Sequence, residues 1–243
     1  MSINIYAHRG FSGMYPENTM IAFSKAIEDC NCNRIELDVH LSKDDNLVII
    51  HDEKVDRTTD GVGFIKDKTI DEIKELNANY IFNDLYPKQS IPTFDEYCEY
   101  VKDKDVITNI ELKTNLIYYD NIEEKVIKTL KRYNLLDRVI ISSFNHSSTI
   151  ITKQIDKTIP CGLLVDSSGI VNIGKYATKL NMNAYHPDVK TLTKQVVQEC
   201  KENNIQVNTW TVNSMKDLIN CVDWQVEGII TNYPNVVSKY ING

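Results

Sequence analysis

Short apolar stretches alternate along the chain with stretches of helical spacing. The apolar stretches are rich in β-branched residues, which is typical of buried strands, and they occupy residues 3–7, 34–41, 47–51, 106–112, 139–144, 161–165, 183–186, 205–212 and 228–231. Amphipathic patterns typical of helices lie between them, at residues 19–29, 93–102, 122–133, 148–155, 173–179, 192–203 and 214–222. Strands and helices in regular succession predict parallel βα units.

The number of these units predicts a closed barrel. About eight βα units in one chain of this length correspond to the α/β class and to a (β/α)8 TIM barrel. We therefore expect a single domain over residues 1–243. An open doubly wound sheet is the alternative, but residues 8–13 read HRGFSG and lack the G-x-G-x-x-G pattern of a nucleotide site.

One stretch, residues 57–91, departs from this rhythm. No strand followed by a helix is evident between His51 and Pro92; residues 56–61 read DRTTDG, a turn cluster, and residues 70–76 are typical of one short helix. The loops after the strands build the active face of a TIM barrel. We interpret residues 57–91 as a small insertion after the second strand, on that face, rather than as a separate domain.

Composition and charge exclude several classes of protein. Hydrophobic residues make up 42% of the chain and charged residues 25%, as in globular proteins. A net charge of -7 without a basic stripe argues against a nucleic-acid partner. The chain contains no apolar run of about 18 residues, the length that a membrane-spanning helix needs. Residues 1–6, MSINIY, do not resemble a signal peptide, so we expect a cytoplasmic protein. The six cysteines show no zinc spacing, and we expect them to be reduced and mostly buried.

Acidic side chains occur where a buried strand should be apolar. Glu36, Asp38 and His40 share one face of the strand at residues 34–41, and Glu111 and Lys113 share one face of the strand that ends near residue 112. Buried carboxylates are costly unless a cation compensates them. Glu36, Asp38 and Glu111 therefore predict a site for Mg²⁺ or Ca²⁺; the alternative is an ion pair of Lys113 with Glu111 or Glu36. For His40 we expect a supporting role or none.

Two further histidines come within reach of these carboxylates. His8 ends the first apolar stretch, at the carboxyl end of a strand, and Arg9 follows it. A hairpin turn at residues 44–46 would fold the stretch 47–51 back on 34–41 and bring His51 opposite residues 38–40, where Asp52 or Glu53 could orient its ring. The remaining histidines, which we expect to be structural loop residues, are His146 and His186.

The assembled set suits hydrolysis of a phosphate ester. A divalent cation together with Arg9 and Lys113 would offset the charge on the phosphoryl oxygens. One histidine would take a proton from the nucleophile and the other would give one to the leaving alkoxide. This chemistry needs an acid and a base in the same site, which explains a pair of imidazoles.

A series of ordered motifs closely resembles the glycerophosphodiester phosphodiesterase family, in its short, cytosolic bacterial form. The matching motifs cover nearly the whole chain; they are HRG at 8–10, PENT at 16–19, ELDV at 36–39, SKD at 42–44, HD at 51–52, RTTDG at 57–61, IPT at 91–93, ELK at 111–113, SSF at 142–144, WTVN at 210–213 and GIIT at 228–231.

The resemblance implies a metal-dependent hydrolysis of glycerophosphodiesters to an alcohol and sn-glycerol 3-phosphate on a TIM barrel with a small insertion, with the glycerophosphodiester as the small-molecule partner. It implies His8 and His51 as the acid/base pair, with His8 favoured as the base, and it also allows the glycerol 2-hydroxyl to attack first and give a cyclic phosphate. The other implied roles are Glu36, Asp38 and Glu111 as ligands of one divalent ion, Mg²⁺ or Ca²⁺; Arg9 and Lys113 as phosphate contacts; Trp210 near the glycerol; and Glu17 and Asn18 as braces of the first loop.

The chain departs from the family pattern at one position, and three other functions remain as alternatives. Many relatives carry Asp where this chain has Asn232, and we expect the change to affect a loop contact but no site residue. A lysophospholipase D would need an apolar rim, which residues 80–82 and 85–86 offer. A non-catalytic phosphodiester-binding module would need no proton donor. A sugar enzyme with Lys113 as a Schiff-base lysine is disfavoured, because Glu111 would keep that lysine charged.

Overall fold

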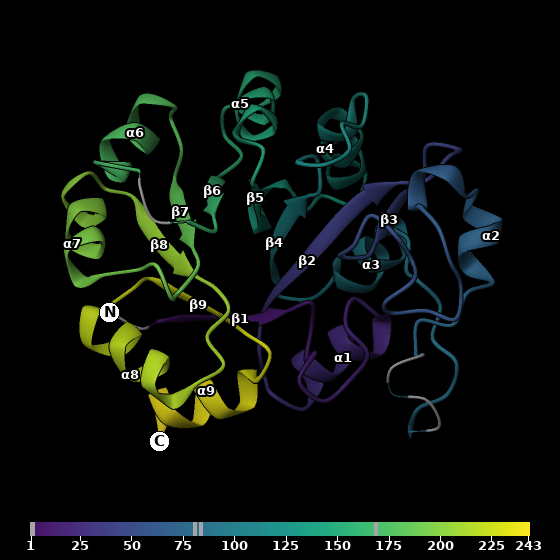
Figure 1. Ribbon diagram of the computed structural model, residues 1–243, viewed down its shortest axis with the longest axis horizontal. Coiled ribbons are helices and arrows are strands. Elements are labelled where there is room, and N and C mark those ends of the chain that lie inside the picture. Colours follow the sequence, from purple (N-terminus) through teal and green to yellow (C-terminus); the bar gives the residue numbers. More distant parts are fainter. Residues whose placement is uncertain (1–2, 80–81, 83–84, 168–169) are drawn as a thin grey trace.

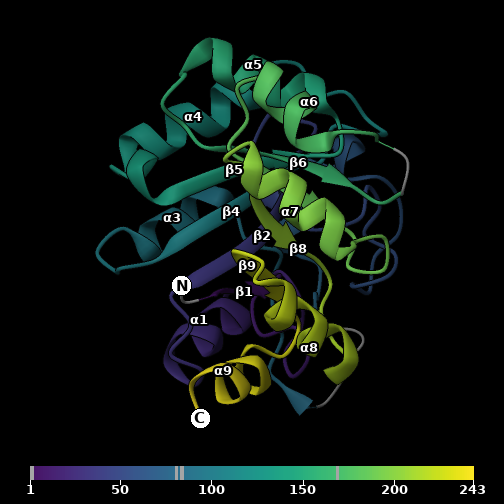
Figure 2. The same ribbon diagram turned by 90° about the vertical axis from the view of Figure 1, so that its left-hand side faces the viewer.

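The computed structural model describes residues 3–79, 82, 85–167 and 170–243. Parallel strands form a closed barrel that helices surround (Figures 1 and 2). The barrel is closed because β1 pairs in parallel with both β2 and β9. Around the ring the strands are β1 (Asn4–His8), β9 (Gly228–Thr231), β8 (Gln206–Thr209), β7 (Ala184–Pro187), β6 (Cys161–Val165), β5 (Val139–Ser143), β4 (Ile107–Leu112) and β2 (Arg34–Leu41). The TIM-barrel prediction is confirmed.

An additional strand, β3 (Leu47–Ile49), pairs antiparallel with β2. The turn between them spans residues 42–46, because Ser42 N donates to Asn46 O at 2.9 Å and Asp45 adopts a positive φ of 66°. Ser42 and Asn46 close the turn, so the loop itself consists of residues 43–45 and lies one residue earlier than the predicted 44–46. Ile50 N therefore donates to Asp38 O, and His51 lies beyond the paired residues. The predicted register of His51 opposite residues 38–40 was wrong by at least one residue.

The helices follow the strands along the chain and cover the outside of the barrel (Figure 2). They are α1 (Met20–Glu28), α2 (Ile70–Lys74), α3 (Phe94–Val101), α4 (Ile122–Arg132), α5 (His146–Ile155), α6 (Ile173–Lys179), α7 (Lys194–Glu202), α8 (Met215–Trp224) and α9 (Pro234–Asn242), with short 3₁₀ turns η1 (Ile65–Asp67) and η3 (Leu136–Arg138). Helix α9 is absent from the predicted elements. It begins with Pro234 at its first position, where the missing N–H costs nothing.

The segment at residues 57–91 packs against the hairpin. Its side chains Ile65, Ile73 and Ile91 form a buried cluster with Val48 of β3 and Ile50. This cluster is separate from the main one, which lies between the strands and the outer helices. The described residues of this segment are thus attached to the barrel through β3 and the residue that follows it.

Two general expectations can be checked against the described residues. The six cysteines are free, and all but Cys30 are buried, as predicted. Among the helices that the structure describes, none has the length and apolar character needed to cross a bilayer.

Candidate active site

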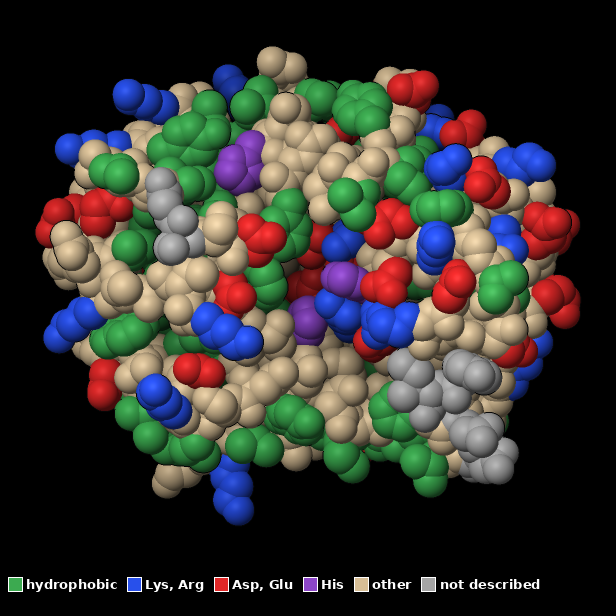
Figure 3. All heavy atoms as spheres, in the orientation of Figure 1, with side chains coloured by type: hydrophobic (Ala, Val, Ile, Leu, Met, Phe, Trp, Pro, Cys, Tyr) green, Lys and Arg blue, Asp and Glu red, His purple; other side chains and the backbone are tan. Residues whose placement is uncertain are grey.

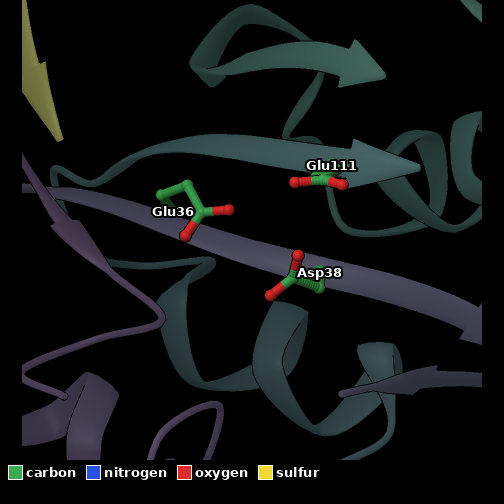
Figure 4. Close-up of side chains that lie close together, drawn as sticks. All are labelled: Glu36, Asp38 and Glu111. Atoms are coloured by element: carbon green, nitrogen blue, oxygen red, sulfur yellow. The ribbon is translucent and has the colours of Figure 1, made fainter. Parts of the chain in front are cut away.

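Three carboxylates converge on β2 and β4, level with the carboxyl end of β1, whose last residue His8 is the register partner of Glu36. Glu36 and Asp38 alternate on β2, and Glu111 on β4 is the direct register partner of Asp38. One oxygen from each carboxylate lies within 4.8 Å of the others, and all three residues are buried (Figure 4). The structure thus brings the three predicted metal ligands together, because parallel neighbouring strands carry them on the same face of the barrel wall.

This cluster has the chemistry of a divalent-cation site. Asp38 Oδ1 is buried and accepts no hydrogen bond from the described residues. Burial, and then repulsion from Asp38 and Glu111, raises the pKa of Glu36 well above its usual range, so the cluster carries more negative charge than its surroundings balance. Oxygens around one Ca²⁺, at about 2.3–2.6 Å from the ion, lie up to about 5 Å apart. The observed spacing fits such an ion, and the all-oxygen donor set suits Mg²⁺ or Ca²⁺.

Two cationic side chains border the carboxylates. Lys113 Nζ donates to Glu111 Oε1 at 2.7 Å and lies 3.7 Å from Asp38 Oδ1. Arg9 N donates to Glu36 Oε2 at 2.9 Å, and Arg9 Nε lies 3.5 Å from Asp38 Oδ2. Burial opposes the charge on Lys113, but Glu111 and Asp38 outweigh burial and raise its pKa. The ion pair considered as the alternative is therefore present beside the cluster, yet two cations do not balance three carboxylates.

His8 stands next to the cluster with its ring fixed from the other side. Its Nδ1 lies 2.6 Å from Asn232 Oδ1, an oxygen that can only accept, so Nδ1 carries the proton and donates. Its Nε2 then faces Glu36 Oε2 at 3.9 Å. Burial, and then the charge of Arg9, lowers the pKa of His8 to about 3. The expectation that Asn232 touches no site residue was wrong, because the loop after β9 closes against the end of β1.

His51 is held in the same manner by an acidic neighbour. Its Nδ1 donates to Asp52 Oδ1 at 2.6 Å. Arg57 Nε donates to the other Asp52 oxygen at 2.7 Å, which fixes that carboxylate in turn. Behind the ring, His40 Nε2 donates to His51 O at 3.1 Å and His40 Nδ1 accepts from Tyr119 Oη at 3.0 Å. The supporting position expected for His40 is thus a contact with the backbone of His51.

The loop after β1 is bound to both sides of the site. Glu17 Oε1 accepts from Arg9 at 2.8 Å, and both Glu17 oxygens accept from Arg57. Asn18, which adopts a positive φ of 54°, donates through Nδ2 to Asp38 Oδ2 at 2.8 Å. Arg57 therefore connects the segment of His51 with the segment of Arg9.

A cavity of about 280 Å³ opens above these groups. The predicted residues His8, Arg9, Glu36, His51, Glu111, Lys113 and Trp210 line it. Trp210 donates through Nε1 to the backbone oxygen of His186 at 2.8 Å, and its ring meets that of Phe144 edge to face, with centroids 5.5 Å apart. In Figure 3 the molecule is hollowed near the middle of this face, where acidic, basic and histidine side chains meet.

Several residues of this site were not identified from the sequence. Asn109, on β4 and two residues before Glu111, lines the cavity, and Arg57 and Asn232 orient other site residues. The alternation on β4 was a signal for Asn109. The contact of Asn232 with His8 joins residues 224 positions apart, and no local sequence pattern predicts such a contact.

The other two histidines have structural contacts, as expected, but they lie in a helix and a strand rather than in loops. His146 begins α5, and its Nε2 donates to Leu164 O at 3.1 Å. His186 is completely buried in β7, where its Nε2 accepts from Asn208 Nδ2 at 3.0 Å. Residues 80–81 of the proposed apolar rim lie outside the described residues. Of the other three rim residues, none lines the cavity.

Comparison with known proteins gives consistent matches over the whole chain. Residues 8–236 match the sequence profile of the Glycerophosphoryl diester phosphodiesterase family. The chain is 42% identical to a glycerophosphodiester phosphodiesterase of Caldanaerobacter subterraneus over 241 residues, which cover 99% of this chain and 98% of the relative. It is 38% identical to one of Bacillus altitudinis, over 97% of this chain and 96% of the relative.

Solved structures match the barrel as well. A phosphodiesterase from Oleispira antarctica, in complex with the product sn-glycerol-3-phosphate, superimposes with a TM-score of 0.89 at 27% identity and covers 99% of this chain and 97% of its own. A structure from Silicibacter pomeroyi superimposes with a TM-score of 0.91 at 19% identity, over 99% of this chain and 93% of its own, which bears on the fold alone.

Proposed function

The chain belongs to the glycerophosphoryl diester phosphodiesterase family, and from this premise we propose that it hydrolyses glycerophosphodiesters to an alcohol and sn-glycerol 3-phosphate with a divalent cation and two histidines. The observation that carries the proposal is a cluster of three convergent carboxylates beside a cavity that is lined by two imidazoles, each held at Nδ1. The product bound in the Oleispira antarctica phosphodiesterase supports the same substrate class.

The anionic phosphate would lie in the cavity, beside the cationic side chains and the carboxylate cluster. Arg9 and Lys113 offer positive charge on the cavity wall, and Trp210 offers an apolar surface for the glycerol. Glu36, Asp38 and Glu111 would hold the Mg²⁺ or Ca²⁺ ion. When bound, this ion would polarise a phosphoryl oxygen and offset its charge.

The two histidines divide the proton transfers. Because burial lowers the pKa of His8, its imidazole is neutral near pH 7 and its Nε2 can accept a proton from the attacking water. The water oxygen bonds to phosphorus, and the bond from phosphorus to the oxygen of the departing alcohol breaks. His51 acts as an imidazolium whose Nδ1 donates to Asp52; it gives the proton on Nε2 to that oxygen and becomes neutral, so the products are a neutral alcohol and a phosphate monoester. If the glycerol 2-hydroxyl attacks first, the same residues form a cyclic phosphate that water then opens.

The experiment is a kinetic assay of the purified protein on glycerophosphocholine, with sn-glycerol 3-phosphate measured by an enzyme-linked assay. We expect hydrolysis that excess EDTA abolishes and that Mg²⁺ or Ca²⁺ restores. His51→Ala should lower kcat by at least about 10²-fold. Full activity in excess chelator would refute the metal assignment, and near-normal turnover of His51→Ala would remove that residue from the chemistry.

The second candidate, a lysophospholipase D, is favoured by one observation. Leu116 is 75% exposed and lines the same cavity together with Phe144 and Leu164. An acyl chain could lie along this apolar side. Comparison of kcat/KM for glycerophosphocholine with that for lysophosphatidylcholine distinguishes the two functions, and we expect the water-soluble diester to be the better substrate.

A further inference from the structure

Arg57, the first residue of the segment 57–91, lies between two carboxylates of the site. Its Nε and Nη2 donate to the two oxygens of Asp52 at 2.7 and 3.0 Å. Its Nη1 and Nη2 donate to the two oxygens of Glu17 at 2.9 and 2.7 Å. One planar guanidinium thus binds both oxygens of two carboxylates, and such paired contacts fix the orientation of each carboxylate as well as its distance.

Each of these carboxylates in turn contacts a residue that lines the cavity. Asp52 Oδ1 accepts from His51 Nδ1 at 2.6 Å, and Glu17 Oε1 accepts from Arg9 Nη1 at 2.8 Å. Both His51 and Arg9 line the cavity. The contacts therefore form one continuous chain of alternating charge, which consists of His51, Asp52, Arg57, Glu17 and Arg9.

Arg57 itself stands outside the cavity. It is not among the described residues that line the cavity, and 42% of its side chain is exposed to solvent. Because Arg57 does not border the space for a ligand, its effect on hydrolysis must pass through Asp52 or Glu17. Its exposure also means that a substitution at this position leaves the buried core unchanged.

Both carboxylates depend on Arg57 for their second contact. Among the described residues, the other ion-pair partner of Asp52 is His51, and the other partner of Glu17 is Arg9. Burial opposes the charge of Glu17, but the hydrogen bonds from Arg57 and the charge of Arg9 outweigh burial and lower the pKa of Glu17. Without Arg57, each carboxylate would keep one partner and could rotate about that single contact.

We propose that Arg57 is a positioning residue that serves both proton transfer and phosphate binding. Through Asp52 it keeps the ring of His51 directed at the leaving alcohol. Through Glu17 it keeps the guanidinium of Arg9 directed at the phosphate. The inference rests on the proposed hydrolysis of glycerophosphodiesters, and it means that one exposed residue outside the cavity controls kcat by one path and KM by the other.

The test is a pair of double-mutant cycles, in which kcat and KM for glycerophosphocholine are measured separately. Arg57→Gln should lower kcat about tenfold and raise KM about threefold. In the Asp52→Asn background the further fall in kcat should be less than about twofold, because the path to His51 is already weakened. In the Glu17→Gln background the further rise in KM should disappear, because the path to Arg9 is already weakened.

Arg57→Lys separates geometry from charge. Lysine keeps the positive charge but cannot bind both oxygens of two carboxylates at once, so its kcat and KM should stay close to those of Arg57→Gln. The matched control is Arg132→Gln on helix α4. Arg132 is also an exposed arginine that is ion-paired with an aspartate, Asp95, and it lies outside the cavity. This control should keep the wild-type kcat and KM.

Three kinetic results would overturn the proposal: wild-type constants in Arg57→Gln, equal losses in the wild-type, Asp52→Asn and Glu17→Gln backgrounds, or full recovery in Arg57→Lys. A wild-type protein that does not cleave the diester would instead refute the proposed function itself. A readout without turnover then remains, because the ¹⁵N chemical shifts of the His51 ring report its tautomer and hydrogen bonds. These shifts should change in Arg57→Gln but not in Arg132→Gln, and identical shifts in both variants would also overturn the proposal.

Discussion

The carboxylate of Asp52 accepts a 2.6 Å hydrogen bond from Nδ1 of His51, the residue that precedes it in the chain. A carboxylate can only accept, so this contact fixes the tautomer of the imidazole and leaves Nε2 toward the cavity. Burial opposes the charge of Asp52, but His51 and Arg57 together overcome it and hold the pKa of Asp52 well below its usual range. Asp52 is therefore ionised at neutral pH.

Asp52→Asn should weaken catalysis more than substrate binding. The amide oxygen of Asn can still accept from His51 Nδ1, but it supplies no negative charge to stabilise the imidazolium that gives its proton to the leaving alcohol. We expect kcat to fall about tenfold with a KM within about twofold of wild type, measured in steady-state assays. A change confined to KM would place Asp52 in substrate binding instead.

Asn232→Ala should separate His8 from its only side-chain hydrogen bond among the described residues. Without the acceptor at 2.6 Å, the ring of His8 loses both its orientation and its preferred tautomer. We expect kcat to fall about tenfold or more while the thermal unfolding midpoint changes little, because Asn232 lies in a loop. Asn232→Asp retains an acceptor and serves as the matched control. If both variants behaved like wild type, Asn232 would have no part in positioning His8.

Divalent cations should stabilise the fold through the three-carboxylate cluster. A ligand that binds only the native state raises the unfolding free energy by mass action, and it would also relieve the repulsion that raises the pKa of Glu36. We expect Mg²⁺ or Ca²⁺ to raise the thermal unfolding midpoint of the wild type. The shift should be much smaller in Glu36→Gln at equal ionic strength. Equal shifts in the two proteins would count against Glu36 as a ligand.

The stability of the barrel should decrease in acid through His186. Burial lowers the pKa of His186 to about 3, whereas an unfolded chain titrates near pH 6.5. Between these values the unfolded state binds a proton that the native state does not bind. The unfolding free energy therefore falls as the pH drops from about 6.5 toward 3, by up to about 1.4 kcal/mol per pH unit.

The variant His186→Gln isolates this contribution from those of His8 and His40, whose pKa values burial also lowers. Glutamine does not titrate, and its side-chain oxygen can accept from Asn208. Denaturant unfolding at pH 7 and pH 5 should show a smaller loss of stability in the variant than in the wild type. An identical loss in both proteins would show that His186 does not contribute.

The barrel and its acidic cluster were predictable because both depend on local repeats. The βα succession specifies the ring, and the alternation of Glu36 and Asp38 on a strand with buried neighbours identifies carboxylates that need compensation. Strand pairing in parallel then brings Glu111 alongside Asp38. For these residues the two-residue alternation of side chains along a strand is sufficient to predict their common face.

The contacts that position and orient the two histidines were harder to predict from the sequence. The position of His51 depends on a turn in which Asp45 adopts a left-handed conformation, and one residue more or less in that turn changes the register. The contact between His8 and Asn232 depends on ring closure, which relates residues at opposite ends of the sequence. Helix α9 carried a local signal, Pro234 at its first position, that the predicted elements did not include.

The pairing of β1 with β9 has a consequence for how the protein is made. The ribosome releases β1 before the other strands of the ring and β9 after them, so one side of β1 stays unpaired until β9 emerges. The loop that orients His8 emerges at the same late stage. Nascent chains that stop before β9 should therefore be catalytically silent even when most βα units have already been translated.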